Sequence, residues 1–225
     1  ALGTNWTDTH GKGGGIYMSD HASINATRLV IADNYAKDVG GGVWAWDDSE
    51  INLVSSIISG NIVGSDGYAA GIYYHLGYSE GWNYPYMINS IIYGNRRIDS
   101  NDINYNINSD QYPGSLIIAY SNIEGYSVII DSIGTIWNSW VEEKWVGNID
   151  EYPHFNDDFT LQEISPCIDA GTAHWENITY SSETIVDITE YNGCAPDMGA
   201  FESPYSTNCD DLLGDINADG SINVL

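Results

Sequence analysis

A short phrase of glycines followed by an apolar and an aromatic residue is repeated three times near the start of this chain. It reads GGGIY at 13–17, GGGVW at 40–44 and, in altered form, AAGIY at 69–73. The last glycine of each copy follows the previous one by 27 and then 29 residues: Gly15, Gly42 and Gly71. Periods of about 20–50 residues are typical of repeat proteins whose units stack on one another. The repeat therefore constrains the fold more than any other feature of the sequence.

A second block keeps the same period as the first. Apolar runs end in asparagine at Asn34, Asn61 and Asn95. Between 13 and 95, short runs of Ile, Val, Tyr and Ser predict strands, and the Gly, Asn and Asp between them predict turns. Coils of about 25–30 residues with three short strands each are typical of a parallel β-helix, or β-solenoid. In such a stack the three asparagines should form a structural ladder of amide hydrogen bonds.

An antiparallel β-sandwich is the alternative, because it also has many short strands at regular spacing. A sandwich does not explain why the glycine block, the strand and the asparagine recur together at one period. We therefore predict an all-β solenoid with clear coils over 13–125. Residues 77–85 read as an insertion that lengthens the third coil.

Alternation along each strand predicts which side chains point outward. The core side of the first two coils should hold Ile16, Met18, Val43 and Ala45. The outer side should carry two columns of rings, which are Tyr17, Trp44 and Tyr73, and next to them Trp46 and His75. Exposed aromatic stripes bind sugars or proteins, so the candidate ligand-binding residues are Tyr17, Trp44, Trp46 and Tyr73. The alternative is that a neighbouring loop, such as 77–85, covers these rings.

The charge balance limits the partners. There are 32 acidic residues against six Lys and Arg, which gives a formal net charge of −26. Nucleic acid is excluded as a natural partner, because phosphate binding needs a basic surface. No apolar run approaches the ~20 residues of a membrane span, so membrane insertion is not expected. The acidity suits calcium and an extracellular setting, or serves only as a solubilising surface.

Three cysteines occur in the chain: Cys167, Cys194 and Cys209. A disulfide between Cys167 and Cys194 is a candidate if the protein is secreted, with Cys209 left over. Three unpaired thiols are the alternative, since spacing alone does not choose a pairing.

The last third of the chain carries a recognisable set of motifs. SPCIDAG at 165–171 and PDMGAFE at 196–202 follow the blocks GNID at 147–150 and PHF at 153–155. Together they resemble the closing signature of secreted pectate-lyase-like proteins of the choice-of-anchor type. The resemblance implies a right-handed parallel β-helix domain over 1–202, closed by 147–202, at an extracellular or cell-surface location. It implies no single activity, since one fold hosts many functions.

Residues 203–225 read as a linker followed by a partial calcium module. The stretch 214–225 resembles the first loop of a type I dockerin, with oxygen ligands at EF-hand-like spacing. The metal ligands implied by this resemblance are Asp215, Asn217, Asp219, Ser221 and Asn223. The acidic ligand expected at position 12 would be residue 226. A disordered acidic tail is the alternative to a Ca²⁺ site.

Many β-helix proteins cleave acidic polysaccharides, which makes catalysis the competing functional hypothesis. A hydrolase needs two carboxylates converging on one bond. Asp20 and Asp47 should stack roughly 5 Å apart in adjacent coils, with Asp48 beside them. A calcium-dependent lyase also needs a basic residue, but Arg28 has Ser55 and Asn89 as its counterparts and no carboxylate cluster facing it.

The sequence thus favours a non-catalytic extracellular or cell-surface protein. The expected roles are adhesion, binding of a glycan or a protein, or assembly of a filament or appendage, with stabilisation by calcium. Coil edges without polar caps favour either head-to-tail self-assembly or further coils upstream. A calcium-dependent polysaccharide lyase or glycoside hydrolase remains the alternative.

Overall fold

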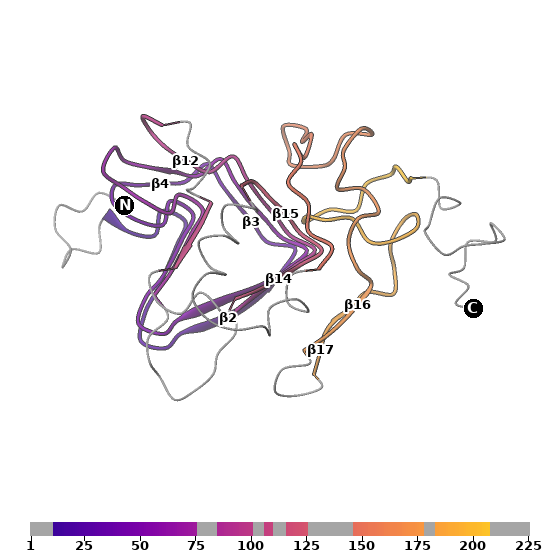
Figure 1. Ribbon diagram of the computed structural model, residues 1–225, viewed down its shortest axis with the longest axis horizontal. Helices are drawn as coiled ribbons and strands as arrows, with labels where there is room; N and C mark the ends of the chain where they lie inside the picture. Colours follow the sequence, from indigo (N-terminus) through magenta and orange to yellow (C-terminus); the bar gives the residue numbers. More distant parts are fainter. Residues whose placement is uncertain are drawn as a thin grey trace.

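The chain winds into a parallel β-solenoid, as a computed structural model shows (Figure 1). The structure describes residues 11–75, 85–100, 106–109, 116–125, 146–177 and 183–207. Three successive coils each give one strand to each of four sheets, and part of a fourth coil follows. Every strand pair in these sheets is parallel, so the antiparallel sandwich is wrong. No α-helix occurs among the described residues, and none of them forms a helix that could cross a membrane.

The four sheets are numbered here in the order in which the chain visits them. Sheet I contains β1 (Ile16–Met18), β5 (Val43–Ala45), β9 (Ile72–Tyr74) and β13 (Ile107–Ser109). Sheet II contains β2 (Ser23–Thr27), β6 (Glu50–Val54), β10 (Tyr86–Ile88) and β14 (Ile117–Ala119). Sheet III contains β3 (Val30–Ala32), β7 (Ile57–Ser59), β11 (Ile91–Tyr93) and β15 (Asn122–Ile123). Sheet IV contains β4 (Tyr35–Ala36), β8 (Ile62–Val63) and β12 (Arg96–Arg97).

The inside of the solenoid is filled by apolar residues. Those at equivalent inward-facing positions of successive strands stack into columns. The predicted inward residues Met18, Val43 and Ala45 belong to this core. Sheet III adds isoleucine in every coil: Ile31, Ile58, Ile92 and Ile123. Tyr74 is fully buried among them and donates a hydrogen bond from its hydroxyl to the carbonyl of Ile51 at 2.8 Å. The alternation read from the sequence therefore predicted the core correctly.

Left-handed residues turn the chain at each corner. The corner between sheets II and III places Arg28, Ser55, Asn89 and Tyr120 in one column, all with φ between 46° and 57°. The corner between sheets III and IV does the same with Asp33, Gly60, Gly94 and Gly125. Because one such residue bends a strand sharply, coils of unlike sequence keep the same outline in Figure 1.

The predicted asparagine ladder is present directly after the second of these corners. The Nδ2 of Asn34 donates to the Oδ1 of Asn61 at 3.0 Å, and Asn61 donates in the same way to Asn95 at 2.9 Å. The Oδ1 of Asn61 also accepts the backbone N–H of Asn34 at 3.0 Å. Each buried amide is thus satisfied by the neighbouring coils, as a buried polar group must be.

The repeated glycines make room for this ladder. A Cβ placed on Gly15, Gly42 or Gly71 would clash first with the backbone carbonyl of the next coil, and it would also lie 3.0–3.1 Å from the Nδ2 of the nearest ladder asparagine. In the fourth coil the position of Gly71 is taken by Asn106, which precedes β13. The Oδ1 of Asn106 accepts the bond from Asn95 at 2.8 Å and so continues the ladder from the opposite sheet. The two sequence blocks therefore recur together because they pack against each other.

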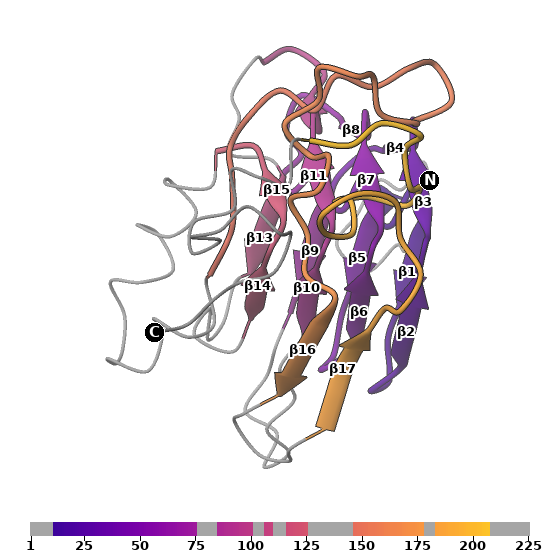
Figure 2. The ribbon, with the colours of Figure 1, turned by 90° about the vertical axis from the view of Figure 1, so that its right-hand side faces the viewer.

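Residues 146–177 and 183–207 do not continue the stack but run back along its side, apart from a short strand-like contact of Ile149 with Asn122 (Figure 2). Leu161, Cys167, Met198 and Ala200 pack against the outer side of sheet III at Ile57 and Ile91. A two-stranded antiparallel hairpin, β16 (His174–Asn177) and β17 (Glu183–Asp187), lies against the outer side of sheet II. We call the described part of 153–207 the closing segment, because it covers two sheet faces.

Candidate functional site

The predicted aromatic column exists, with its rings in register. Tyr17, Trp44 and Tyr73 are direct partners in adjacent strands of sheet I. The ring centroids of Tyr17 and Trp44 are 4.9 Å apart. The predicted register of these three residues is therefore confirmed, and so is the ring contact between Tyr17 and Trp44.

The expectation that the whole column is exposed is wrong. Tyr17 is 42% exposed, but Trp44 and Tyr73 retain only 4% and 2% of their accessible surface. They form a small cluster of their own outside sheet I with Val39, Ala69 and Tyr68. The Nζ of Lys12 lies 4.3 Å from the centroid of Trp44, over its ring. The chain that leads into each glycine phrase folds over the column, and alternation within the strand contains no information about this cover.

The second aromatic column is where an accessible surface remains. Trp46 and His75 are both half-buried, and their ring centroids are 3.8 Å apart. Trp46 lies at the corner between sheets I and II and also contacts Trp44, with centroids 5.3 Å apart. An indole at a corner presents an apolar surface next to polar turn atoms. This combination suits contact with a sugar or a protein.

The candidate carboxylates lie at the same corner. Asp20 and Asp47 are exposed left-handed residues with φ of 60° and 55°, and the coils bond there from His21 N–H to the carbonyl of Asp47 at 3.0 Å. The Nε2 of His21 lies 3.9 Å from Asp48 Oδ2. The predicted equivalence of Asp20 and Asp47 is thus confirmed as a shared backbone position. Neither carboxylate accepts a hydrogen bond from the described residues, so the structure does not surround either of them as a catalytic acid is surrounded.

No metal centre is evident in the described part of the chain, where His, Cys, Asp and Glu form no group of three that could hold an ion. The proposed calcium ligands Asp215, Asn217, Asp219, Ser221 and Asn223 lie outside the described residues. They therefore stay a prediction.

The disulfide proposed between Cys167 and Cys194 is wrong. Cys167 is a free thiol and completely buried, and its Sγ accepts a hydrogen bond from Asn122 Nδ2 at 3.1 Å. Burial raises the pKa of this thiol to about 11. Cys194 belongs to a disulfide and lies half-buried in a loop, while Cys209 is outside the described residues. Sequence spacing did not reveal that Cys167 packs into the closing segment's own core.

The two motifs that carry the family resemblance have a structural role. Asp197 is 1% exposed, and its carboxylate accepts the backbone N–H groups of Asp169 at 2.8 Å and Ser203 at 2.7 Å. The Oδ1 of Asp169 accepts the N–H of Cys194 at 3.0 Å. The carboxylate of Asp197 thereby joins PDMGAFE to SPCIDAG, and the carboxylate of Asp169 holds the residues that directly precede PDMGAFE. Burial raises the pKa of Asp197, and hydrogen bonds to the two backbone groups oppose this shift.

Glu202 completes this arrangement. Its Oε1 accepts the N–H of Asp197 at 3.2 Å, whereas its Oε2 is buried with no hydrogen-bond partner among the described residues. Burial raises the pKa of Glu202, and the negative charge of Asp197 raises it further. Protonation of Glu202 is therefore favoured by its surroundings.

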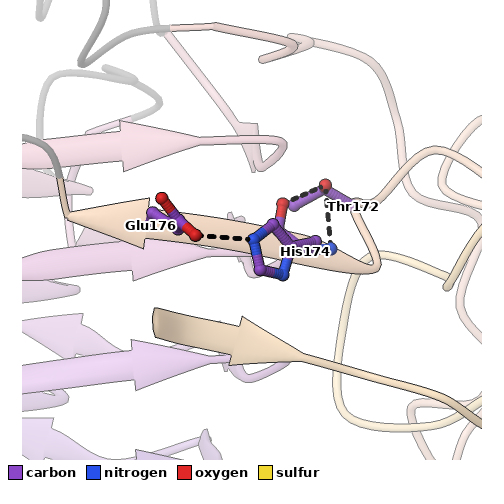
Figure 3. A network of polar contacts seen from close by, with 3 residues as sticks. All are labelled: Thr172, His174 and Glu176. Atoms are coloured by element: carbon purple, nitrogen blue, oxygen red, sulfur yellow. Dashed lines mark hydrogen bonds and ion pairs between the residues drawn. The ribbon is translucent and has the colours of Figure 1, made fainter. Parts of the chain in front are cut away.

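The outward surface of the hairpin carries a separate polar contact. The Nε2 of His174 lies 3.2 Å from Glu176 Oε1, and the backbone carbonyl of His174 accepts the hydroxyl of Thr172 at 2.8 Å (Figure 3). His174 and Glu176 are both exposed, and Figure 3 shows them side by side on one face of β16. An exposed pair of this kind contributes little to stability and forms no recessed site.

Comparisons with known proteins give no family for this chain. No family model, no curated protein and no solved structure matches it. The fold therefore defines the class of the protein, an all-β parallel solenoid, and the function has to be argued from its surface.

Proposed function

We propose that this protein is a non-catalytic solenoid that binds a glycan or a protein at the cell surface or outside the cell. The observation that carries the proposal is the corner between sheets I and II. There the stacked rings of Trp46 and His75 lie next to the exposed residues Asp20 and Asp47. Ring faces pack on sugar or side-chain carbons, and carboxylates accept hydrogen bonds from hydroxyl groups. We call this corner the aromatic corner.

A second candidate function is calcium-dependent cleavage of a polysaccharide. The stacked backbone positions of Asp20 and Asp47 favour it, since they put two carboxylates on adjacent coils. The exposure of both residues opposes it, because hydrolysis by a carboxylate pair needs one member held as an acid by its surroundings. Binding therefore explains the aromatic corner better than cleavage does.

Other parts of the proposal rest on sequence and on general rules. The disulfide at Cys194 and the high acidity support an oxidising, extracellular location. Right-handed winding is proposed because parallel connections between twisted strands almost always have that hand. The dockerin-like stretch 214–225 is proposed to bind Ca²⁺ and to attach the solenoid to a scaffold or neighbouring subunit.

The binding proposal is tested by affinity electrophoresis in gels containing one soluble polysaccharide each: a neutral glucan, polygalacturonate, or a chitosan oligomer. Retardation in at least one gel is expected, and Trp46→Ala should weaken it by about fivefold to tenfold because the ring platform is lost. Tyr35→Ala is the matched control, since Tyr35 is a part-exposed ring on sheet IV, away from the aromatic corner. Equal loss in both variants, or no retardation in any gel together with no capture of a cell-surface protein, contradicts the proposal.

The two candidate functions are separated by an assay for newly formed reducing ends and for unsaturated products, with and without a chelator. The binding proposal expects no cleavage in either condition. Cleavage that disappears with the chelator, and in Asp47→Asn, would establish the enzyme instead.

A further inference from the structure

An asparagine followed directly by a glycine lies in the loop between β17 and the motif PDMGAFE. Asn192 and Gly193 are both exposed, and no other asparagine of the chain precedes a glycine. A main-chain nitrogen can attack the carboxamide of the asparagine before it and close a succinimide ring. The attack is least hindered when the second residue is glycine, which has no Cβ and a wide choice of backbone angles. The sequence therefore makes Asn192 the asparagine most open to this reaction.

The fold leaves the attacking group available. The N–H of Gly193 donates no hydrogen bond to a described residue, and its φ of 93° lies where glycine is favoured. The carboxamide of Asn192 is held by two long bonds from its Nδ2, at 3.2 Å to the carbonyl of Ser203 and 3.3 Å to that of Tyr205. Hydrogen bonds longer than usual at an exposed side chain open readily. The side chain can therefore turn toward the nitrogen that attacks it.

Asn89 shows how the same reaction is prevented elsewhere in the fold. It also precedes a small residue, Ser90, but it is completely buried. Its Oδ1 accepts the N–H of Thr172 and its Nδ2 donates to the carbonyl of Thr172, both at 2.8 Å. The N–H of Ser90, which would have to attack, donates to Ser121 Oγ at 3.0 Å. Carboxamide and nucleophile are both held here, in contrast to the loop at 192–193.

A charge at position 192 would enter an acidic environment. A carboxylate there would face the carbonyl oxygens of Ser203 and Tyr205, to which Asn192 now donates. Acceptors that face each other without a donor repel, so both contacts would be lost. Glu202 also accepts a hydrogen bond from the backbone of Asn192, which places a second carboxyl group nearby. The new charge would therefore push residues 203–205 away from the loop.

A longer main chain at this point would disturb a second set of contacts. In isoaspartate the main chain runs through the former side chain and is longer by the Cβ. Gly193 has no room for this, since even a Cβ built on it would collide with Asp169 Oδ1. The same carboxylate accepts the N–H of Cys194 at 3.0 Å and the hydroxyl of Thr207 at 2.8 Å. Both bonds would be displaced together.

We propose that Asn192 is a site of spontaneous deamidation that loosens the end of the closing segment. The nitrogen of Gly193 gives its proton to solvent and bonds to Cγ of Asn192, and the Cγ–Nδ2 bond breaks. The Nδ2 takes a proton from solvent and leaves as ammonia. Water then opens the succinimide at either carbonyl and leaves aspartate or isoaspartate at position 192. The reaction needs only water, so the change accumulates with the age of the folded protein, independently of the aromatic corner.

The site is tested by incubating the full 225-residue chain at pH 6 and pH 9, followed by peptide mapping. Aspartate and isoaspartate are expected at position 192, with more at pH 9 because the attacking nitrogen must lose its proton. Asn192→Gln should slow conversion at this position at least about tenfold, since glutamine has to close a larger ring. Asn89 is the internal control and should stay unmodified while the chain is folded.

The loosening is tested by hydrogen exchange. The backbone N–H groups of Ser203 and Thr207 should exchange at least about fivefold faster in Asn192→Asp and in aged wild-type protein than in fresh protein. The N–H of Ile57, which bonds within the coils, should exchange at the same rate in all samples. If Asn192→Asp does not fold, as judged by circular dichroism, the aged wild-type protein alone gives the comparison.

Three outcomes overturn the proposal. The first is the absence of any product at position 192 at pH 9. The second is conversion of Asn89 in the folded chain as fast as that of Asn192, because the fold would then select no site. The third is exchange at Ser203 and Thr207 that stays as slow in the modified protein as in the fresh protein.

Discussion

The solenoid coils and the closing segment bury polar groups in two different ways. In the coils each buried amide is satisfied by the same residue of the neighbouring coil, as Asn34, Asn61 and Asn95 show. In the closing segment one carboxylate, that of Asp197, accepts two N–H groups that have no repeated counterpart. The first arrangement distributes stability along a column, and the second concentrates it at one residue.

This difference predicts where a single substitution acts. A ladder residue contacts the coils on both sides, so its loss should lower the stability of the whole solenoid. A residue such as Asp197 joins parts of one segment, so its loss should release that segment and leave the coils folded.

The largest effect is expected for Asn61→Ala, at about 3–5 kcal/mol of unfolding free energy. The substitution leaves the backbone N–H of Asn34 without its acceptor and removes the Nδ2 donor from the carbonyl of Ile31, at roughly 1–3 kcal/mol for each buried group left unsatisfied. It also removes one of the two donors to the Oδ1 of Asn95, which keeps the backbone N–H of residue 61. Urea unfolding followed by tryptophan fluorescence measures the change. Asn34→Ala is the control and should lower the unfolding free energy by about 1 kcal/mol. Asn34 lies in the first coil, where its Nδ2 donates to Asn61 and its Oδ1 accepts no bond from the described residues. Equal losses in the two variants would contradict the ladder as a cooperative column.

A smaller and local effect is expected for Asp197→Ala. The backbone N–H groups of Asp169 and Ser203 lose their acceptor, at about 2–3 kcal/mol for the closing segment. The native thiol of Cys167 gives the measurement, because it reacts with a disulfide reagent only after the segment opens. Labelling should be much faster in the variant, with urea unfolding of the coils little changed. Asp158→Ala, which removes the acceptor of Thr160 in an exposed turn, should leave the labelling rate as it is.

The smallest effect is expected for Glu202→Gln and depends on pH. Since the pKa of Glu202 is raised in the folded state, its contribution is fully present below the unfolded pKa and is lost as pH rises through the folded pKa. Glutamine resembles the protonated form and should stabilise the closing segment at pH 7 by less than about 1 kcal/mol, because solvent screens a part-exposed group. Hydrogen exchange of the segment at pH 7 and pH 4 measures the difference. An advantage of the variant that is as large at pH 4 as at pH 7 would show that charge is not its cause.

The coils could be predicted from the sequence because their determinants are local and repeated. Gly15, Gly42 and Gly71 and the asparagines after the corners recur at one period, so one correct register fixed the core, the ladder and the stacked rings. The cover over Trp44 and Tyr73 could not be predicted in this way. It comes from Val39, Tyr68 and Lys12, which precede the repeated phrase and lie above the column only after the chain has coiled.

The closing segment could not be predicted from periodicity, because its contacts join residues far apart in the chain. Asn89 bonds to Thr172 across 83 residues, and Asn122 bonds to Cys167 across 45. No repeat marks these pairs, so the sequence did not reveal that Cys167 is buried as a free thiol beside Asn122. For this reason the proposed Cys167–Cys194 disulfide was wrong. Of the candidate site, the pairing of Trp46 with His75 and the equivalence of Asp20 and Asp47 were predicted correctly, whereas the accessibility of the aromatic rings depended on the cover described above.

The corner between sheets I and II has one more property, which concerns how such a protein can change over evolution. Successive ladder asparagines are 27 and then 34 residues apart, and most of the extra length falls between Tyr74 at the end of β9 and Tyr86 at the start of β10. The asparagine ladder keeps its register across this extra length, because it lies at another corner of the coil, between sheets III and IV. New sequence can therefore be grafted beside the aromatic corner without refolding the scaffold, so selection or design can diversify the recognition surface separately from the framework.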